Sequence, residues 1–291
     1  MSMKMRVLIT GSKGQLGNEI RMIAGSRPEW EFFYTDVEEL DITNQQAVHE
    51  FLDKYRPEVL INCASYTAVD KAEENKNIAE LINAKAVQIL ANECSRQDVF
   101  MVHVSTDFVF GGEKNTPYVE ADFPNPRSVY ALSKFHGEQA FLEKATNGCI
   151  VRTSWLYSSF GQNFVKTMLK LGKERDQLGV VYDQVGSPTY AHDLARAIFG
   201  LVDQRDRMEN VEIYHYSNEG LASWYDFSAA VMEYAGLKCH VKPILAAEYP
   251  LPASRPHYSV MSKKKIREFL EFEIPHWRKS LEKCIKNLEN K

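Results

Sequence analysis

The sequence predicts an α/β fold: a doubly wound parallel sheet of the Rossmann type joined to a second, smaller α/β domain. Three observations support this fold class. Short apolar, β-branched segments alternate with longer segments of helical periodicity through the first half of the chain. A glycine-rich segment directly follows the first apolar segment. After about Trp155 the rhythm changes, and prolines, aromatic residues and polar loops become denser.

The expected strands and helices of the first half alternate regularly. Continuous apolar strands separated by helices are typical of a parallel sheet covered on both faces, because each parallel connection crosses back over the sheet. The strands are expected at Arg6 to Thr10, Glu31 to Tyr34, Val59 to Asn62, Val99 to Ser105 and Cys149 to Arg152. The helices are expected at Gln15 to Ala24, Asn44 to Tyr55, Asn75 to Gln97 and Ser128 to Lys144.

The bulk composition argues against several classes of protein. The chain has 291 residues and a formal net charge of -4, whereas nucleic-acid binders usually carry a basic excess. No apolar run approaches the roughly 20 residues of a membrane span, and the first ten residues lack a signal-peptide core. We therefore expect a cytoplasmic protein without a membrane or nucleic-acid partner. The five cysteines are odd in number and widely spaced, which disfavours a disulfide scaffold or a structural zinc site.

Three spaced glycines lie between the first expected strand and the first expected helix: Gly11, Gly14 and Gly17. One allows a tight turn, one allows the backbone to approach a pyrophosphate, and one lets helix and strand pack closely. The helix N-terminus adds free N–H groups and a positive dipole end. An ordinary glycine-rich turn is the alternative. We predict that this segment binds a dinucleotide, together with its intervening residues Lys13, Gln15 and Leu16.

Two residues near this loop carry opposite signals about the cofactor. Asp36 follows the second strand, where an acid usually bonds the adenosine ribose of NAD and disfavours the extra phosphate of NADP. Lys13 instead favours NADP, because an ammonium group there could pair with the extra phosphate. We expect NADPH as the cofactor, with NADH as the alternative.

The segment Tyr130-Ala131-Leu132-Ser133-Lys134 is a Y-x-x-x-K motif on an expected helix. Positions i and i+4 share a helix face, and a lysine near a tyrosine stabilises the phenolate and is expected to lower the pKa of the phenol toward working pH. The tyrosine could then donate a proton to a carbonyl oxygen while a nicotinamide delivers hydride. A second copy of the motif begins at Tyr234, but Gly236 interrupts it and it lies late in the chain, so a packed helix residue is expected there.

A hydroxyl pair, Ser105 and Thr106, ends the fourth expected strand. The carboxyl ends of parallel strands line the ligand crevice, where a hydroxyl can hydrogen-bond a developing alkoxide. Strand alternation sends one of the two side chains toward the crevice and the other into the sheet.

Several motifs occur in order from the first strand to about Ser259. They are G-x-x-G-x-x-G at residues 11–17, N-C-A-S-Y-T-A-V-D-K-A-E at 62–73, R-T-S-W-L-Y at 152–157, D-Q-V-G-S-P-T at 183–189, and Arg255-Pro256. Together with the Y-x-x-x-K motif, they resemble the dTDP-4-dehydrorhamnose reductase family, a part of the extended short-chain dehydrogenase/reductase superfamily.

The resemblance implies roles for individual residues. It favours Thr106 as the catalytic hydroxyl beside Tyr130 and Lys134, with Ser105 in support. On the cofactor side it implies contacts from Asp41, Ile42, Ala64, Ser65 and Thr67. On the substrate side it implies contacts from Val69, Thr106, Asp107, Trp155, Asn163 and Arg255. For Trp155 a core aromatic is the alternative, and for Asp41 a helix cap or turn is the alternative.

The resemblance also implies the organisation of the chain. Residues 1–155 are expected to form the dinucleotide-binding domain, and residues 156–291 mostly the substrate-binding domain. Part of the second half, about residues 179–201, is expected to return to the main sheet. Some relatives place acids for a metal-bridged dimer near the first helix, where Glu19 lies; His192 stands at about the second position, so no metal is predicted. A monomer or a homodimer is expected.

The implied activity is the NADPH-dependent reduction of the 4-keto group of dTDP-4-dehydro-beta-L-rhamnose to dTDP-L-rhamnose. The residues alone predict only that a bound nicotinamide reduces a carbonyl group. A nucleotide-sugar dehydratase or epimerase is the nearest alternative, but Phe108 stands where dehydratases typically carry a glutamate that moves protons. A non-catalytic regulator, similar to the regulatory subunit of methionine adenosyltransferase, is the alternative from another class.

Overall fold

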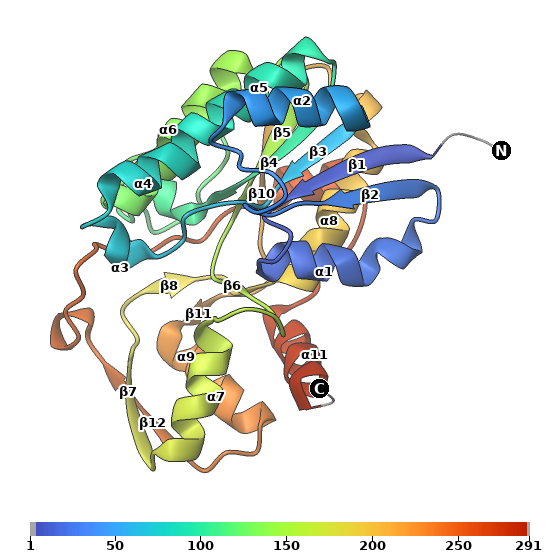
Figure 1. Ribbon diagram of the computed structural model, residues 1–291. Helices are drawn as coiled ribbons and strands as arrows, with labels where there is room; N and C mark the ends of the chain where they lie inside the picture. The colour runs from blue at the N-terminus through green and yellow to red at the C-terminus, as the bar shows by residue number, and fades with distance from the viewer. Residues whose placement is uncertain (1–3, 290–291) are drawn as a thin grey trace.

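The computed structural model describes residues 4–289 and is built on a six-stranded, fully parallel sheet (Figure 1). The strand order is β10-β5-β4-β3-β1-β2. Because β2 and β3 flank β1 on opposite sides, the winding direction reverses at β1, as in a doubly wound sheet. The strands are β1 (Met5–Thr10), β2 (Trp30–Tyr34), β3 (Val59–Asn62), β4 (Phe100–Thr106), β5 (Gly148–Thr153) and β10 (Glu212–Tyr216). This confirms the predicted fold class.

Helices cover both faces of the sheet, as Figure 1 shows. Along β1, Val7 and Ile9 pack in one core with α1 and α8, whereas Leu8 packs in a second core with α2, α5 and α6. This alternation explains the continuous apolar strands, since side chains on both faces are buried. The helices are α1 (Gln15–Ile23), α2 (Gln45–Tyr55), α5 (Ala86–Arg96), α6 (Val129–Lys144), α8 (Ala191–Asp203) and α10 (Lys264–Leu270).

The long helix expected at Asn75 to Gln97 is interrupted. It consists of α4 (Lys76–Glu80), a π-helical turn η2 (Leu81–Lys85) and α5. The neighbouring helix α6 approaches this turn closely at Gly137, where an added Cβ would lie 2.0 Å from the backbone oxygen of Asn83. A glycine is therefore needed at this crossing, and the π-helical turn lies at the contact between the two helices.

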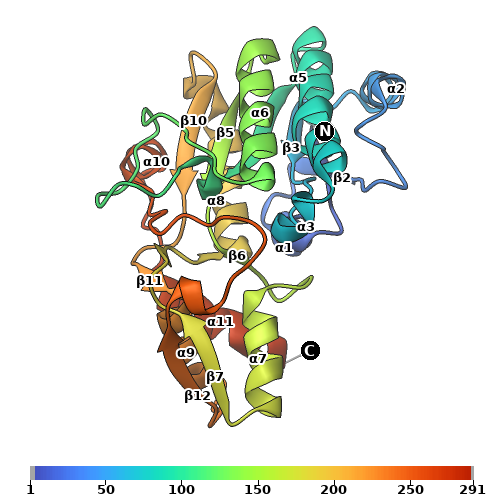
Figure 2. The same cartoon turned by 90° about the vertical axis from the view of Figure 1, so that its left-hand side faces the viewer.

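The rest of the chain forms a smaller lobe below the main sheet, which we call the small lobe (Figures 1 and 2). It contains β7 (Gln177–Val181), which pairs in parallel with β12 (His240–Ile244). The helices α7 (Phe164–Glu174), α9 (Trp224–Tyr234) and α11 (Trp277–Glu289) pack with these strands around a separate core. The main sheet and its helices are called the large lobe below.

The expectation that about residues 179–201 return to the main sheet is wrong for the first part of this segment, because β7 pairs with β12. Leu178 and Val180 are buried in the small lobe's core, whereas Gln177 and Gly179 are exposed, which is typical of a strand covered on one face only. The helix α8, which belongs to the same segment, does pack against the main sheet as expected. The sixth strand of the main sheet is instead β10, which pairs with β5.

Short elements connect these parts. They are η1 (Ala24–Ser26), α3 (Val69–Ala72), η3 (Asp107–Val109), β6 (Leu156–Tyr157), β8 (Val185–Gly186), β9 (Thr189–Tyr190), η4 (Arg205–Arg207), β11 (Ala222–Ser223) and η5 (Ala246–Glu248). Within residues 4–289, no helix is both long enough and apolar enough to cross a membrane.

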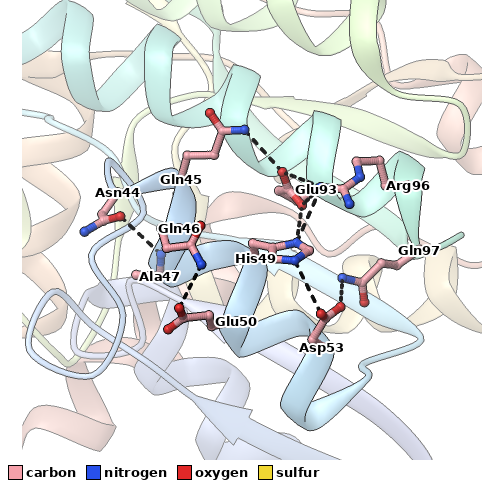
Figure 3. Close-up of polar contacts among 10 residues, drawn as sticks. All are labelled: Asn44, Gln45, Gln46, Ala47, His49, Glu50, Asp53, Glu93, Arg96 and Gln97. Atoms are coloured by element: carbon pink, nitrogen blue, oxygen red, sulfur yellow. Dashed lines mark hydrogen bonds and ion pairs between the residues drawn. The ribbon is translucent and has the colours of Figure 1, made fainter.

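A polar cluster joins α2 to α5 on the outer face of the large lobe (Figure 3). Its centre is Glu93, which is only 1% exposed. The Glu93 carboxylate lies 3.0 Å from His49 Nδ1 and accepts a hydrogen bond of 2.9 Å from Arg96. His49 Nε2 lies 3.4 Å from Asp53. A buried carboxylate needs such partners, so the cluster fixes how the two helices pack.

Candidate active site

The candidate site lies where the parallel strands of the main sheet end. Thr10, Asn62 and His103 are neighbours in the strand register, and their side chains form a buried network. The Thr10 hydroxyl donates to Asn62 Oδ1 at 2.7 Å, and Asn62 Nδ2 lies 3.1 Å from His103 Nδ1. Burial holds the pKa of His103 well below its usual value, so the ring is neutral. This network links β1, β3 and β4 next to the loops that form the site.

The glycine loop forms a tight cradle between β1 and α1. Gly11 has φ of +65°, and a Cβ there would meet the Ala64 backbone nitrogen at 2.6 Å. At Gly17 a Cβ would lie 2.5 Å from the Ser12 Cα, so this glycine allows loop and helix to touch. Gly14 is the N-cap of α1 and has no side chain to bond the first N–H groups of the helix. Those groups remain available to a phosphate, so the residues present fit a dinucleotide.

Acidic residues surround Lys13 at the position expected to meet the adenosine ribose. Asp36 Oδ2 accepts the Lys13 backbone N–H at 3.0 Å, and the Lys13 ammonium lies 2.5 Å from Glu38 and 3.4 Å from Glu39. The hydrogen bond to Glu38 raises the pKa of Lys13. Glu38 was not among the predicted site residues, although three acids, Asp36, Glu38 and Glu39, follow β2 closely in the sequence. In this structure Glu38 competes with any phosphate for the Lys13 ammonium.

The two residues expected at the adenine have local roles in this structure. Asp41 Oδ1 accepts hydrogen bonds from the backbone N–H and the hydroxyl of Thr43. Asp41 therefore stabilises a turn, which was the alternative to an adenine contact. Ile42 is 7% exposed and packs in the core below α2. Contacts from Asp41 and Ile42 to an adenine stay predictions.

Tyr130 lies in the first turn of α6 and faces the end of β4. Ser128 caps this helix by accepting the Ala131 N–H at 3.2 Å, and Glu73 accepts the Val129 N–H at 2.9 Å. The Tyr130 ring is 9% exposed and its hydroxyl is hydrogen-bonded to Thr106. The expected lowering of the pKa of Tyr130 by Lys134 is wrong for this structure, because burial raises the pKa of Tyr130 to about 12. The structure thus brings the predicted tyrosine and the predicted threonine together.

Lys134 follows Tyr130 by one helical turn and is 2% exposed. Its ammonium donates to the Val104 carbonyl oxygen at 2.7 Å, so it is held under the end of β4. Burial lowers the pKa of Lys134 to about 8, and the charge of Glu138, one turn further along α6, raises it. Glu138 is itself neutralised by a buried ion pair with Arg152, at 2.7 Å.

Asp107 adds a buried carboxyl group to the site. It is 1% exposed and accepts the Thr106 hydroxyl at 3.2 Å through Oδ1. Burial raises the pKa of Asp107 to about 7, although Ser259 interacts with the same carboxyl group and lowers its pKa. No donor of residues 4–289 is placed to hydrogen-bond Oδ2. Ser105 Oγ is also buried without a partner. Such unsatisfied polar atoms are costly in a folded protein and are common at functional sites.

Asn83, in the π-helical turn, supports the site through hydrogen bonds and was not among the predicted site residues. Its Oδ1 accepts from Ser65 Oγ at 2.9 Å and from the Tyr66 N–H at 2.8 Å, and its Nδ2 donates to Ser133 Oγ at 3.0 Å. It therefore joins the loop after β3 to the helix that carries Tyr130. The predicted cofactor residue Thr67, in the same loop, is exposed.

Apolar side chains surround the Tyr130 ring. Phe108 lies edge-on to it, with ring centroids 5.9 Å apart at 77°, and Val69 and Tyr66 pack in the same small cluster. The predicted substrate residue Val69 is thus beside the predicted proton donor. Tyr234, in the second Y-x-x-x-K motif, lies at the end of α9 in the small lobe and bonds Arg278.

Trp155 follows β5, where the chain passes toward the small lobe. Its φ of +46° is unusual for a residue other than glycine. Its indole stacks on Trp224, with centroids 3.5 Å apart and planes 4° apart, and a Cβ at Gly186 would lie 2.6 Å from it. Packing and backbone together hold this side chain, and strained residues of this kind cluster at functional sites.

The remaining predicted substrate residues are engaged within the protein. Asn163 is the N-cap of α7, accepting from the Lys166 N–H at 3.1 Å, and its amide donates to Gln15 Oε1 at 3.0 Å. The predicted cofactor residue Gln15 is thus linked to the small lobe. Arg255 pairs with Asp70, its NH2 group lying 2.7 Å from Oδ2.

The side chains of Glu19 and His192 are neighbours, and Glu19 also has a hydroxyl partner. Glu19 is 2% exposed and accepts from Ser158 Oγ at 2.6 Å, while His192 Nδ1 lies 3.3 Å from its other oxygen. Over residues 4–289, no group of three or more His, Cys, Asp or Glu side chains is placed to hold a metal ion.

The chain is similar to known proteins over nearly its whole length. The family model described as "RmlD substrate binding domain" matches residues 5–290. A dTDP-4-dehydrorhamnose reductase of Aggregatibacter actinomycetemcomitans is 39% identical over 95% of this chain and 97% of its own length.

Two solved structures are similar over the whole molecule. A dTDP-4-dehydrorhamnose reductase of Clostridium acetobutylicum superposes with a TM-score of 0.93 at 41% identity, covering 98% of this chain and 100% of that one. The enzyme of that name from Bacillus anthracis, solved in complex with NADP, has a TM-score of 0.93 at 38% identity with the same coverage. The chain therefore belongs to the dTDP-4-dehydrorhamnose reductase family of the extended short-chain dehydrogenases/reductases.

Proposed function

We propose that this protein reduces the 4-keto group of dTDP-4-dehydro-beta-L-rhamnose to dTDP-L-rhamnose, using NADPH. The observation that carries the proposal is the buried group at the end of β4. There the Tyr130 hydroxyl bonds Thr106, and Lys134 lies one turn away in a chain of this family. The relatives' names supply the substrate, and the site supplies a proton donor suited to a carbonyl.

NADPH, when bound, supplies the hydride that reaches the carbonyl carbon. Tyr130 donates its phenolic proton to the carbonyl oxygen, which completes the alcohol. A pKa near 12 keeps Tyr130 protonated before the step. A Lys134 pKa near 8 leaves its ammonium mostly charged at neutral pH, and this charge stabilises the phenolate formed by the step. Thr106 orients the phenol through their shared hydrogen bond, and Tyr130 recovers its proton from solvent.

The other site residues divide between cofactor and substrate. For the cofactor we propose contacts from Gly11, Lys13, Gly14, Gln15, Leu16, Gly17, Asp36, Asp41, Ile42, Ala64, Ser65 and Thr67. For the nucleotide sugar we propose contacts from Val69, Thr106, Asp107, Trp155, Asn163 and Arg255. A monomer or homodimer in the cytoplasm is part of the proposal. Phe108, edge-on to Tyr130, cannot exchange protons, which favours reduction over dehydration.

The test is NADPH oxidation on addition of dTDP-4-dehydro-beta-L-rhamnose, measured for the native protein and for Tyr130→Phe and Tyr234→Phe variants. Tyr130→Phe should lower kcat by about 10²- to 10⁴-fold, the usual contribution of a positioned proton donor. Tyr234→Phe is the matched control and should keep native turnover, because Tyr234 lies in the small lobe. Tight dinucleotide binding without turnover by the native protein, with either NADPH or NADH, would contradict the reductase and favour a regulator.

A further inference from the structure

A salt bridge joins two segments that are 185 residues apart in the sequence. Asp70 lies in the short helix α3, just after the loop that follows β3. Arg255 lies in the segment between η5 and α10. The Arg255 NH1 and NH2 groups donate to Asp70 Oδ1 and Oδ2 at 3.0 and 2.7 Å. The Ala253 N–H donates to Asp70 Oδ1 at 3.2 Å, so one carboxylate holds three donors of residues 253–255.

This contact joins the large lobe to the segment that runs between the two lobes. Figure 2 shows the chain after η5 passing between the lobes near α3 before it returns to α10. Tyr258 forms a bridge with Val185, in the small lobe's β8. A Cβ at Gly112 would lie 2.9 Å from both the Pro256 Cα and the His257 nitrogen, so the segment also touches the loop after β4. We call residues 253–258 the strap.

The salt bridge leaves part of the Arg255 guanidinium free for another anion. A guanidinium carries five N–H donors in a planar fork. Arg255 uses three of them, two toward Asp70 and one from NH1 to the Ala253 carbonyl oxygen at 2.8 Å. The remaining two, on Nε and NH2, lie on one edge of the fork, and no acceptor within residues 4–289 occupies them. An edge of this kind matches two oxygens of a phosphate group.

The negative charge of Asp70 holds the Arg255 guanidinium in this orientation. The hydrogen bonds from Arg255 hold the pKa of Asp70 below its usual value, so the carboxylate is ionised at neutral pH. The side chains of Arg255 and Asp70 are 18% and 36% exposed, so solvent only partly screens the pair. Val69, the neighbour of Asp70, packs in the cluster around Tyr130. The salt bridge therefore sits next to the reacting centre without belonging to it.

We propose that Asp70 is a positioning residue for the substrate: it holds the strap against α3 and orients the free edge of Arg255 toward the diphosphate of the nucleotide sugar. This rests on the proposed function. When the Arg255 side chain is already fixed before the substrate binds, the binding free energy no longer includes the entropic cost of ordering it. The opposing effect is repulsion between the Asp70 carboxylate and the diphosphate. We expect preorganisation to dominate, because the guanidinium lies between the two anions.

The test compares Asp70→Ala and Asp70→Asn with the native enzyme in the NADPH-dependent reaction. The expected result for Asp70→Ala is a rise of the KM for the nucleotide sugar on the order of tenfold, as for a lost charge-assisted contact. Asp70→Asn keeps an oxygen acceptor and should show a smaller rise. The kcat and the KM for NADPH should stay within about twofold, because Asp70 touches neither the proton donor nor the glycine loop.

Asp122→Asn is the matched control. Asp122 also accepts a lysine ammonium at 2.6 Å and a backbone N–H at 2.8 Å, and it is 26% exposed, but it lies in the loop between η3 and α6. This variant should leave both KM values unchanged. A combined Asp70→Ala and Arg255→Met variant tests the route of the effect. If Asp70 acts through Arg255, the KM for the nucleotide sugar should be no higher in the double variant than in Arg255→Met alone.

A second measurement does not depend on turnover. Amide hydrogen exchange at Ala253 should become faster in Asp70→Ala, because the carboxylate that accepts this N–H is gone. An active native enzyme whose Asp70→Ala variant has an unchanged or lower KM for the nucleotide sugar would overturn the positioning role. A native protein without turnover would instead contradict the proposed function, whatever the exchange data show for the strap.

Discussion

Three ionisable side chains around the end of β4 have pKa values that are shifted by burial: Tyr130, Lys134 and Asp107. Their residue types suggest proton chemistry, but their protonation states depend on their surroundings. The phenol stays protonated well above neutral pH, the ammonium is near its titration point in mildly basic solution, and the carboxyl titrates near neutrality. Such separated pKa values are typical of sites that transfer protons.

Asp107 should make the stability of the protein depend on pH. In the folded state Asp107 keeps its proton up to a pH of about 7, whereas an unfolded carboxyl loses it near 3.8. The folded state then binds more protons over this range, so the free energy of unfolding falls as pH rises from about 4 to 7. The shift corresponds to at most about 4 kcal/mol. Asp107→Asn removes this titration.

Urea unfolding of native protein and Asp107→Asn at several pH values checks this. The stability of the variant relative to the native protein should increase between pH 4 and pH 8. A constant difference across this range would show that Asp107 is not titrating there. Asp122→Asn is the control and should differ from the native protein by a constant amount over this range. Lys114 lowers the pKa of Asp122, so its stabilising contribution is lost only as pH falls below the ordinary carboxyl value of 3.8.

At the scale of elements, the helix starts follow local signals in the sequence. Asn44, Ser128, Asn163 and Ser223 each cap a helix by accepting a backbone N–H within the first turn. The expected starts of α2 and α6 therefore agree with the structure to within one residue. The π-helical turn at Leu81–Lys85 could not be predicted, because it lies where α6 approaches from 50 residues further along the chain.

Gly137→Ala should destabilise the protein by about 1–3 kcal/mol, the usual cost of overpacking. A Cβ at this position would lie 2.0 Å from the Asn83 backbone oxygen, so α6 and the π-helical turn must move apart. That movement also disturbs Asn83 and Ser133 beneath the site, so kcat should fall as well. The measurement is the urea midpoint together with turnover. Gly25→Ala is the control, since a Cβ there meets nothing within 4 Å, and equal effects of the two variants would contradict the packing argument.

At the scale of the whole molecule, the chain crosses between the lobes several times. The core beneath the main sheet combines Val7, Ile9 and Ile61 of the first half with residues of α8, β10 and α10. The large lobe is therefore completed by segments beyond residue 190. The small lobe has its own core, also assembled from separated segments. Neither lobe corresponds to one continuous half of the sequence.

A fragment of residues 1–155 should consequently not fold into a stable domain. Without α8, β10 and α10, one face of the sheet and the edge of β5 would be exposed to water. Circular dichroism during urea titration should show no cooperative transition for the fragment, while the full chain shows one. A cooperative transition together with NADPH binding by the fragment would contradict this prediction.

The sequence by itself determined the parallel strands of the first half, the glycine cradle and the pair of Tyr130 and Lys134. These features are encoded in short windows: apolar periodicity, helix caps and motifs whose residues lie one turn apart. Only the tertiary structure decided the pairing of β7 with β12, the addition of β10 to the main sheet, and the pairing of Lys13 with Glu38 and of Arg255 with Asp70. It also decided the shifted pKa values. The physical reason is that burial and strand pairing depend on residues far apart in the chain, about which a local pattern carries no information.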